Sequence, residues 1–333
     1  MTLLQNPHQS MTVLITGGAG FIGSHLVDYL LRETAHEVIA LDNFSTGSAS
    51  NLRDCKTDRL EIVDEDIRNE ALVANLVAGA DIVYHLAAAV GVKRIVDNPL
   101  ESMQTNLEGT ENVLEAAADD ATPTFIASSS EVYGKSEAIP FSEDDDVVYG
   151  STSSSRWGYA TAKAADEFLA LAYHTERDLP VVIGRYFNIV GPRQTGQYGM
   201  VIPRFVEQAL AGDDLTVYGD GTQTRSFTHV EDAVSITHDL LTTSSTHGDV
   251  FNIGASDPTS INELAERVIE LTDSDSGITH IPFAEAYDDD FEEPDEREPD
   301  ISKLRDAIGR SPTADLDRIL RDVINERTDA VVA

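Results

Sequence analysis

Residues 13–42 read VLITGGAGFIGSHLVDYLLRETAHEVIALD, and this stretch decides the fold. Its first three residues form a short, wholly apolar run, which predicts a parallel strand buried on both faces. Apolar residues at helical spacing over 21–31 predict a helix, and a further apolar run over 38–41 predicts a second strand. Three glycines at three-residue spacing follow the first strand: Gly17, Gly20 and Gly23. They let the backbone turn tightly and approach a pyrophosphate, so the stretch predicts a βαβ unit that binds a dinucleotide.

Asp42 closes the second strand of this unit. A carboxylate at this place accepts hydrogen bonds from both ribose hydroxyls of an adenosine and repels the 2′-phosphate of NADP. The predicted cofactor is therefore NAD. A glycine motif alone occurs by chance, but here strand, turn, helix, strand and acid come in the order that the unit requires.

Strands and helices continue to alternate after this unit. Further strands are predicted over 60–63, 81–86, 124–129 and 180–186, and helices over 70–77, 99–118 and 157–173. Strict alternation predicts an α/β fold with a doubly wound parallel sheet of the Rossmann type, whose ligand lies at the carboxyl ends of the strands.

Beyond residue 188 the regular alternation ends. Helices are predicted over 201–210, 230–241 and 261–271, and strands over 215–218 and 250–253. We therefore predict an NAD-binding Rossmann domain over 11–188, to which elements near 216–253 return. The remainder, mostly 189–325, is predicted to form a smaller α/β substrate-binding cap domain.

The chain of 333 residues is strongly acidic, with 59 acidic against 23 basic side chains and a net charge of −36. Long-range repulsion argues against nucleic acid or an anionic membrane as a partner. The acids are spread over the whole chain, which predicts a halophilic protein from a salt-rich cytoplasm that loosens at low ionic strength. An ordinary acidic protein is the alternative.

The sequence also bears on location and cofactors. No apolar run reaches the roughly 18 residues of a membrane span, and residues 1–10 lack the basic start and apolar centre of a signal peptide. Cys55 is the only cysteine and cannot form an internal disulfide, which suits a reducing cytosol. We predict a cytoplasmic protein without a metal site.

Tyr159 and Lys163 stand four residues apart, so their side chains share one face of the predicted helix over 157–173. The ammonium and the positive nicotinamide of NAD favour the phenolate of a tyrosine, whose usual pKa is near 10. A phenolate can take the proton of a sugar hydroxyl while the hydride of the same carbon goes to nicotinamide. Ser129, at the end of the strand over 124–129, is placed to hold the reacting oxygen. Such a pair also arises by chance, but the trio after a glycine motif is more specific.

Seven motifs together resemble those of one family. They are TGGAGFIGSHL at 16–26, HLAA at 85–88, TNLEGT at 105–110, SSSEVYG at 128–134, YATAK at 159–163, RYFNIVGPR at 185–193 and VYGDGTQTRSFTHVED at 217–232. Over about residues 11–325 the chain resembles the extended short-chain dehydrogenase/reductase family. Its NAD-dependent members are nucleotide-sugar epimerases, dehydratases and decarboxylases.

The resemblance implies roles for residues that match its motifs. Ser129, Tyr159 and Lys163 would form the catalytic triad, with Glu131 as a further candidate. The cofactor would contact Gly17, Gly20, Phe21, Ile22, Gly23, Asp42, Asn43, Asp66, Ile67, Leu86, Ala87, Ala88, Asn106, Tyr159, Lys163 and Tyr186. The nucleotide sugar would contact Ser129, Ser130, Asn188, Val201, Arg204, Tyr218, Arg225 and Arg297, the two last as clamps on the diphosphate. The helices over 99–118 and 157–173 would pair across a homodimer.

The members of the family share oxidation at C4 of the sugar and differ in the next step. A 4,6-dehydratase carries Asp-Glu before its Val-Tyr-Gly, whereas this chain has Ser130 and Glu131. The Ser-Glu pair, the Arg156-Trp157 dipeptide and Arg297 in REPDI resemble decarboxylases. The loop AAAVGVKR at 87–94 resembles epimerases instead, and its Lys93 and Arg94 could meet a carboxylate.

We predict an epimerase that acts by transient C4 oxidation of a UDP-hexose, and within that class a UDP-glucose 4-epimerase. The alternative is a UDP-glucuronate decarboxylase or a UDP-glucuronate 4-epimerase, and a 4,6-dehydratase is less consistent with the motifs. A catalytically inactive NAD-binding sensor is the alternative outside enzymes, and the intact trio of Ser129, Tyr159 and Lys163 argues against it.

Overall fold

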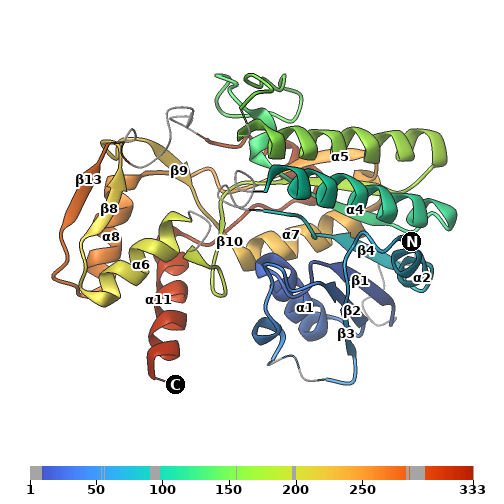
Figure 1. The fold of residues 1–333 in the computed structure, drawn as a ribbon, viewed down its shortest axis with the longest axis horizontal. Coiled ribbons are helices and arrows are strands. Elements are labelled where there is room, and N and C mark those ends of the chain that lie inside the picture. Colours follow the sequence, from blue (N-terminus) through green and yellow to red (C-terminus); the bar gives the residue numbers. More distant parts are fainter. Residues whose placement is uncertain are drawn as a thin grey trace.

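A seven-stranded sheet forms the centre of the molecule (Figure 1). The structure is a computed structural model that describes residues 10–332 except 54, 56, 91–97, 155, 197–199, 283–284 and 286–296. The strand order is β11-β6-β5-β4-β1-β2-β3, and every neighbouring pair is parallel. The strands are β1 (Thr12–Thr16), β2 (Glu37–Asp42), β3 (Leu60–Asp64), β4 (Ile82–His85), β5 (Thr124–Ser129), β6 (Val181–Tyr186) and β11 (Asp249–Ile253). The predicted doubly wound parallel sheet is confirmed.

The order of the strands reverses between β1 and β4. From β1 the chain runs outward through β2 to the edge strand β3, and then returns to pair β4 with the other side of β1. The carboxyl ends of β1 and β4 therefore flank a crevice, which is where sheets of this kind bind their ligands. Both strands are almost wholly buried, which accounts for their continuous apolar runs.

Helices cover both faces of the sheet. One face packs against α1 (Phe21–Glu33), α7 (Val230–Thr242) and α10 (Ser302–Ile308). The other face packs against α2 (Glu70–Ala78), α4 (Pro99–Asp119) and α5 (Arg156–Arg177). The last two lie side by side along their face (Figure 1). Helix α5 is longer than the predicted 157–173 and extends to Arg177.

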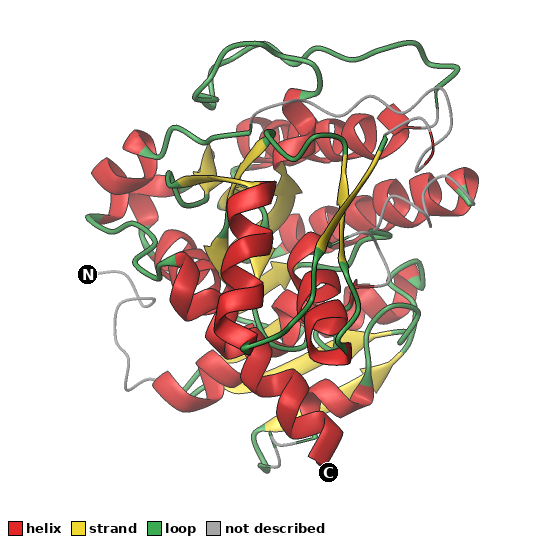
Figure 2. Cartoon of the chain, turned by 90° about the vertical axis from the view of Figure 1, so that its left-hand side faces the viewer, coloured by secondary structure: helices red, strands yellow, loops and turns green. Residues whose placement is uncertain are grey.

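The remaining elements form a smaller group beside the sheet, seen at the left of Figure 1 and from its own side in Figure 2. Its core contains Phe205, Val217, Leu264 and Leu320. The helices are α6 (Val201–Ala211), α8 (Ile261–Thr272) and α11 (Leu316–Val332). Short strands pair two by two: β7 (Ile189–Val190) with β10 (Thr228–His229), β8 (Leu215–Tyr218) with β13 (Ile278–Ile281), and β9 (Thr224–Ser226) with β12 (Pro258–Ser260). Single turns of 3-10 helix are η2 (Ala49–Leu52), η3 (Ser130–Tyr133) and η5 (Ser244–Thr246).

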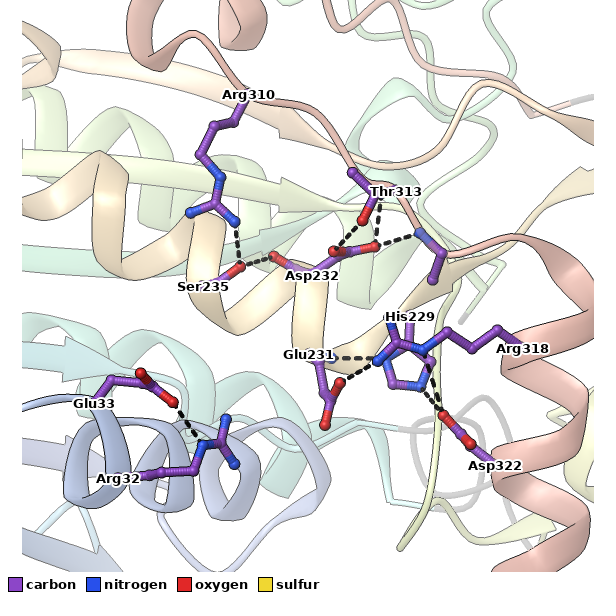
Figure 3. Close-up of polar contacts among 11 residues, drawn as sticks. Arg32, Glu33, His229, Glu231, Asp232, Ser235, Arg310, Thr313, Arg318 and Asp322 are labelled. Atoms are coloured by element: carbon purple, nitrogen blue, oxygen red, sulfur yellow. Dashed lines mark hydrogen bonds and ion pairs between the residues drawn. The ribbon is translucent and has the colours of Figure 1, made fainter.

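Hydrogen bonds and ion pairs connect the C-terminal segment to α7 and to the residue before it (Figure 3). The Asp232 carboxylate accepts hydrogen bonds from the amides of Thr313 and Ala314, both at 2.8 Å. One ring nitrogen of His229 caps the start of α7, and the other lies 3.2 Å from the carboxylate of Asp322 on α11. Because α11 also packs into the core of the smaller group, these contacts hold that group against the sheet.

Some sequence-based expectations lie outside the described residues, namely those on residues 1–9 and on Lys93 and Arg94. Within the described ranges, no helix combines the length and the hydrophobicity that crossing a bilayer requires.

Candidate functional site

The glycine loop between β1 and α1 lies against the segment that follows β4. Gly17 has a φ of +71°, and a Cβ there would come within 2.8 Å of the Ala87 amide nitrogen. A Cβ on Gly23 would lie 2.1 Å from the Gly17 carbonyl oxygen. The first position needs glycine for its left-handed backbone, and the second for close packing of the helix on the loop. The loop therefore has the tight shape that a pyrophosphate requires.

The amino end of α1 opens toward this loop without a capping side chain among the described residues. Gly20 is the N-cap residue, and the first turn, which begins with the predicted Phe21 and Ile22, contains no acid. Backbone amides and the positive end of the helix dipole are therefore available to an anion. A phosphate fits this end of the helix.

Three predicted cofactor residues meet beyond the end of β2. The two carboxylate oxygens of Asp42 accept hydrogen bonds from backbone amides of the adjoining loops, at 2.9 and 2.8 Å. Burial raises the pKa of Asp42, and these hydrogen bonds oppose the rise. The Asn43 amide donates to Asp66 at 2.9 Å, and Arg68 holds the pKa of Asp66 well below its usual range. These polar groups stand where the adenosine ribose is expected.

The segment after β4 contains the predicted Leu86, Ala87 and Ala88. Its position is fixed by Asn106 on α4, which accepts a hydrogen bond from the Ala89 amide at 2.7 Å. Asn106 is buried, so this contact is shielded from water. The segment is therefore held at the edge of the crevice.

Two other predicted cofactor residues are packed into the layers beside the sheet. Ile67 is buried against α4, where a Cβ on Gly109 would lie 2.7 Å from its Cγ2. Tyr186 ends β6, and its hydroxyl pairs with Thr237 on α7 at 2.7 Å. Its ring is therefore turned toward α7, and its contact with a cofactor stays a prediction.

Ser129 and Tyr159 are brought together from the end of β5 and the first turn of α5, and their side chains are hydrogen-bonded. The pKa of Tyr159 is raised well above its usual value, mainly by desolvation and further by the charge of Glu131, while the hydrogen bond from Ser129 opposes the rise. The expected lowering of this pKa is thus absent from the structure. The physical reason is the burial of the hydroxyl, to which the negative charges of Glu131 and Asp166 add.

Glu131 lies in η3, directly after Ser129, and forms an ion pair with Arg297 from a distant part of the sequence. Arg297 is only 8% exposed. Since the Glu131 charge acts on Tyr159, the ion pair lies near the candidate catalytic hydroxyls. The structure therefore brings Arg297 to the same end of the site as Ser129 and Tyr159.

The other predicted sugar-nucleotide residues are divided between the sheet and the smaller group. Arg204 on α6 stacks on the Tyr218 ring, with its guanidinium carbon 4.4 Å from the ring centroid. Asn188, which has a φ of +40°, donates to the Ser226 carbonyl at 3.0 Å. Arg225, Val201 and Ser130 lie on β9, at the start of α6 and in η3, respectively. These residues therefore come from both parts of the fold, and their contact with a sugar nucleotide stays a prediction.

Sequence reasoning missed a chain of buried polar side chains behind Lys163. His85, at the end of β4, contacts the hydroxyls of Thr16 at 2.8 Å and Thr110 at 3.0 Å. Thr110 lies near Asp166 and lowers the pKa of that carboxyl. Asp166 follows Lys163 by three residues on α5, so helical spacing was a signal that could have found this pair.

His85 is expected to make stability depend on pH. Burial lowers its pKa to about 3, with the charge of Lys163 adding to the effect. The unfolded chain takes up this proton below about pH 6.5, so the stability from a neutral His85 is present above that pH and is lost as the pH falls towards 3. The free energy of unfolding of the wild type is expected to exceed that of His85→Gln at about pH 7.5. This difference is expected to be smaller by about 1–2 kcal/mol at about pH 5.

Urea unfolding of both proteins at the two pH values, in constant strong salt, measures this difference. A difference that stays constant would show that His85 is not held neutral by the fold.

Comparison with known proteins identifies the class. Residues 13–254 match the sequence profile described as the NAD dependent epimerase/dehydratase family, and the chain belongs to that family. NAD is the cofactor of this family, and the glycine loop, the uncapped end of α1 and Asp42 fit its phosphates and ribose.

Among individual proteins, the chain is 45% identical over 312 residues to UDP-N-acetyl-alpha-D-glucosaminuronate decarboxylase of Bacillus cytotoxicus, covering 93% of this chain and 96% of that one. It is 37% identical to UDP-glucuronic acid decarboxylase 6 of Arabidopsis thaliana, covering 92% and 86%. The structure superposes with a TM-score of 0.85 on UDP-glucuronic acid 4-epimerase from Bacillus cereus in complex with UDP-glucuronic acid and NAD, at 31% identity, covering 96% and 100%.

Proposed function

We propose that the chain is an NAD-dependent decarboxylase of a UDP-linked uronic acid. The observation that carries this proposal is the Glu131–Arg297 ion pair beside Ser129 and Tyr159. A buried guanidinium at the reacting end of the site suits a substrate that carries a carboxylate on its sugar. The similarity to decarboxylases favours this alternative over the UDP-glucose 4-epimerase that the sequence first indicated.

The first step needs a base and a hydride acceptor. Tyr159, once ionised, takes the proton of the C4 hydroxyl while Ser129 holds the oxygen. Bound NAD supplies the acceptor for the hydride of the same carbon. Lys163 is placed on the Tyr159 face of α5, where an ammonium can bind a ribose hydroxyl of the cofactor.

The second step breaks the bond between C5 and its carboxylate. Carbon dioxide leaves, and the electron pair moves into the C4 carbonyl, whose oxygen is stabilised by the hydroxyls of Ser129 and Tyr159. The substrate carboxylate competes with Glu131 for Arg297, so Glu131 loses its counter-ion and takes up a proton. Glu131 would then give this proton to C5. C4 would regain its hydride and the C4 oxygen the proton held by Tyr159, so that one proton from water is consumed overall.

Products from three substrates test the proposal. Incubation in strong KCl with UDP-glucuronate, UDP-N-acetylglucosaminuronate and UDP-glucose separately is expected to give a product from at least one uronate that has lost the mass of carbon dioxide. An isobaric product with inverted C4 would instead support the UDP-glucuronate 4-epimerase, which the similarity to the Bacillus cereus structure keeps as the second candidate.

Glu131→Gln tests the role of the acid. Carbon dioxide release is expected to fall by about 10²–10³-fold, while oxidation at C4, followed by the nicotinamide absorbance, persists. The matched control is Glu137→Gln, since Glu137 is exposed in the loop after η3. If Glu131→Gln and its control release carbon dioxide equally fast, Glu131 takes no part in the chemistry.

The proposal also covers the domains, the location and the oligomeric state of the protein. We propose that residues 11–188, together with β11, bind NAD. The substrate-binding domain is formed mostly by residues 189–325, and the protein is cytoplasmic. A homodimer through α4 and α5 is supported by Leu100 and Phe168, which are 71% and 73% exposed on these helices. Apolar side chains this exposed are typical of an interface.

A further inference from the structure

Asp166 carries a fully buried carboxylate on the same helix as Tyr159 and Lys163, two of the proposed catalytic residues. The Lys163 ammonium lies 3.2 Å from Asp166 one turn further along α5, and the two side chains are 3% and 0% exposed. Burying a carboxylate costs free energy even when it is paired, and desolvation raises the pKa of Asp166 while Lys163 and Thr110 lower it. An apolar residue in place of Asp166 would leave the Lys163 ammonium buried and unpaired, so this acid is best explained by what it does for the lysine.

A chain of hydrogen bonds that starts at the cofactor loop ends at Thr110, beside Asp166. The Ala87 amide donates to the Thr16 hydroxyl at 3.2 Å, and this hydroxyl contacts Nδ1 of His85 at 2.8 Å. Nε2 of His85 contacts the Thr110 hydroxyl at 3.0 Å, and Thr110 lies close enough to Asp166 to lower the pKa of its carboxyl.

The chain has one consistent direction. Because the Thr16 oxygen accepts from an amide, its own proton is free to go to Nδ1 of a neutral His85, which then donates from Nε2 to Thr110. The Thr110 proton is left on the side of Asp166, whose Oδ1 atom has no hydrogen-bond partner among the described residues. The links between Thr16, His85 and Thr110 are buried, so water does not interrupt this part of the chain.

We propose that Asp166 is a positioning residue of the active site: it holds the Lys163 ammonium on the face of α5 that carries Tyr159. This inference rests on the proposed role of Tyr159. A fixed carboxylate of this kind also leaves the neighbourhood of Tyr159 less positive than the lysine alone would make it.

The pH at which Tyr159 ionises distinguishes a positioning role of Asp166 from a role in packing alone. The groups that face Tyr159 are Glu131, Ser129 and Asp166, and those that face Asp166 are Lys163, Thr110 and Glu167. Asp166 raises the pKa of Tyr159, as does Glu131. Removing the Asp166 charge should therefore let Tyr159 ionise at lower pH, whereas removing the Lys163 charge should have the opposite effect.

A titration cycle tests this without any sugar. The absorbance of tyrosinate is followed against pH in wild type, Asp166→Asn, Lys163→Met and the double variant, and the same proteins carrying Tyr159→Phe are subtracted so that only Tyr159 is seen. We expect its midpoint to fall by about one pH unit in Asp166→Asn, to rise in Lys163→Met, and to return near the wild-type value in the double variant. Thr246→Val, which removes another fully buried hydroxyl, is the control and should leave the midpoint unchanged.

Equal midpoints in Lys163→Met and the double variant would overturn the proposal. This comparison remains decisive if Asp166→Asn alone fails to fold, because the double variant contains no unpaired buried charge. In Asp166→Asn, the pH below which kcat/KM falls should also be lower than in the wild type. If the titration responds as expected but no uronate is converted, the positioning role holds and the proposed substrate is wrong.

Discussion

Replacing Tyr159 by Phe is expected to lower kcat by about 10³-fold and to leave the Kd for NAD within about twofold. The ring stays, so the packing of α5 against η3 is preserved, but the hydroxyl that pairs with Ser129 is gone. Without it nothing at this place takes the C4 proton, because the remaining hydroxyl of Ser129 is far too weak a base. Turnover of the sugar nucleotide and calorimetric titration with NAD measure the two effects separately.

Tyr173→Phe is the matched control, because it removes a hydroxyl from the other end of the same helix. The Tyr173 hydroxyl donates to Glu115 at 2.6 Å, away from the crevice. Its removal should leave turnover unchanged. Wild-type turnover in Tyr159→Phe would exclude this tyrosine from the mechanism, and loss of NAD binding would show that the ring was disturbed.

The sequence allowed the fold to be predicted because its signals are local. The apolar run over 13–15 needs burial on both faces wherever it lies. Gly17 is required by the left-handed backbone of its own turn, and Gly23 by its contact with Gly17 in the same βαβ unit. Alternation of strands and helices then leaves few ways to arrange a parallel sheet. The fold could therefore be predicted from residues that lie close together in the sequence.

The electrostatics of the site depend on partners that are distant in sequence. Arg297 reaches Glu131 across 166 positions, and His85 meets Thr110 from a different element of the sheet layer. The pKa of Tyr159 could not be deduced from its spacing to Lys163, because burial and two carboxylates outweigh that single neighbour. Spacing identified which residues meet, but the sign of their interaction depends on what surrounds them.

The chain is expected to lose its fold at low salt. Its net charge is −36, and its arginines are engaged by acids in many ion pairs, as in Asp317 with Arg267 and Arg321, so the remaining acids repel one another. The screening length is about 3 Å at 1 M salt and about 30 Å at 0.01 M, so repulsion between surface acids is suppressed only in strong salt. We expect the Tm to fall by at least about 20 °C between 1 M and 0.01 M KCl. Scanning calorimetry over this range measures the fall.

Two variants show whether repulsion is the cause. The triple variant Glu61→Gln, Glu176→Gln and Glu266→Gln neutralises exposed acids, and it should shift the salt concentration needed for folding downward. Asp317→Asn removes an acid that is paired with two arginines, and it should shift that concentration upward instead. If salt stabilised the protein because carboxylates bind hydrated cations, the triple variant would need more salt than the wild type. The direction of its shift therefore decides between the two causes, and a Tm that does not change with KCl would contradict the halophilic interpretation altogether.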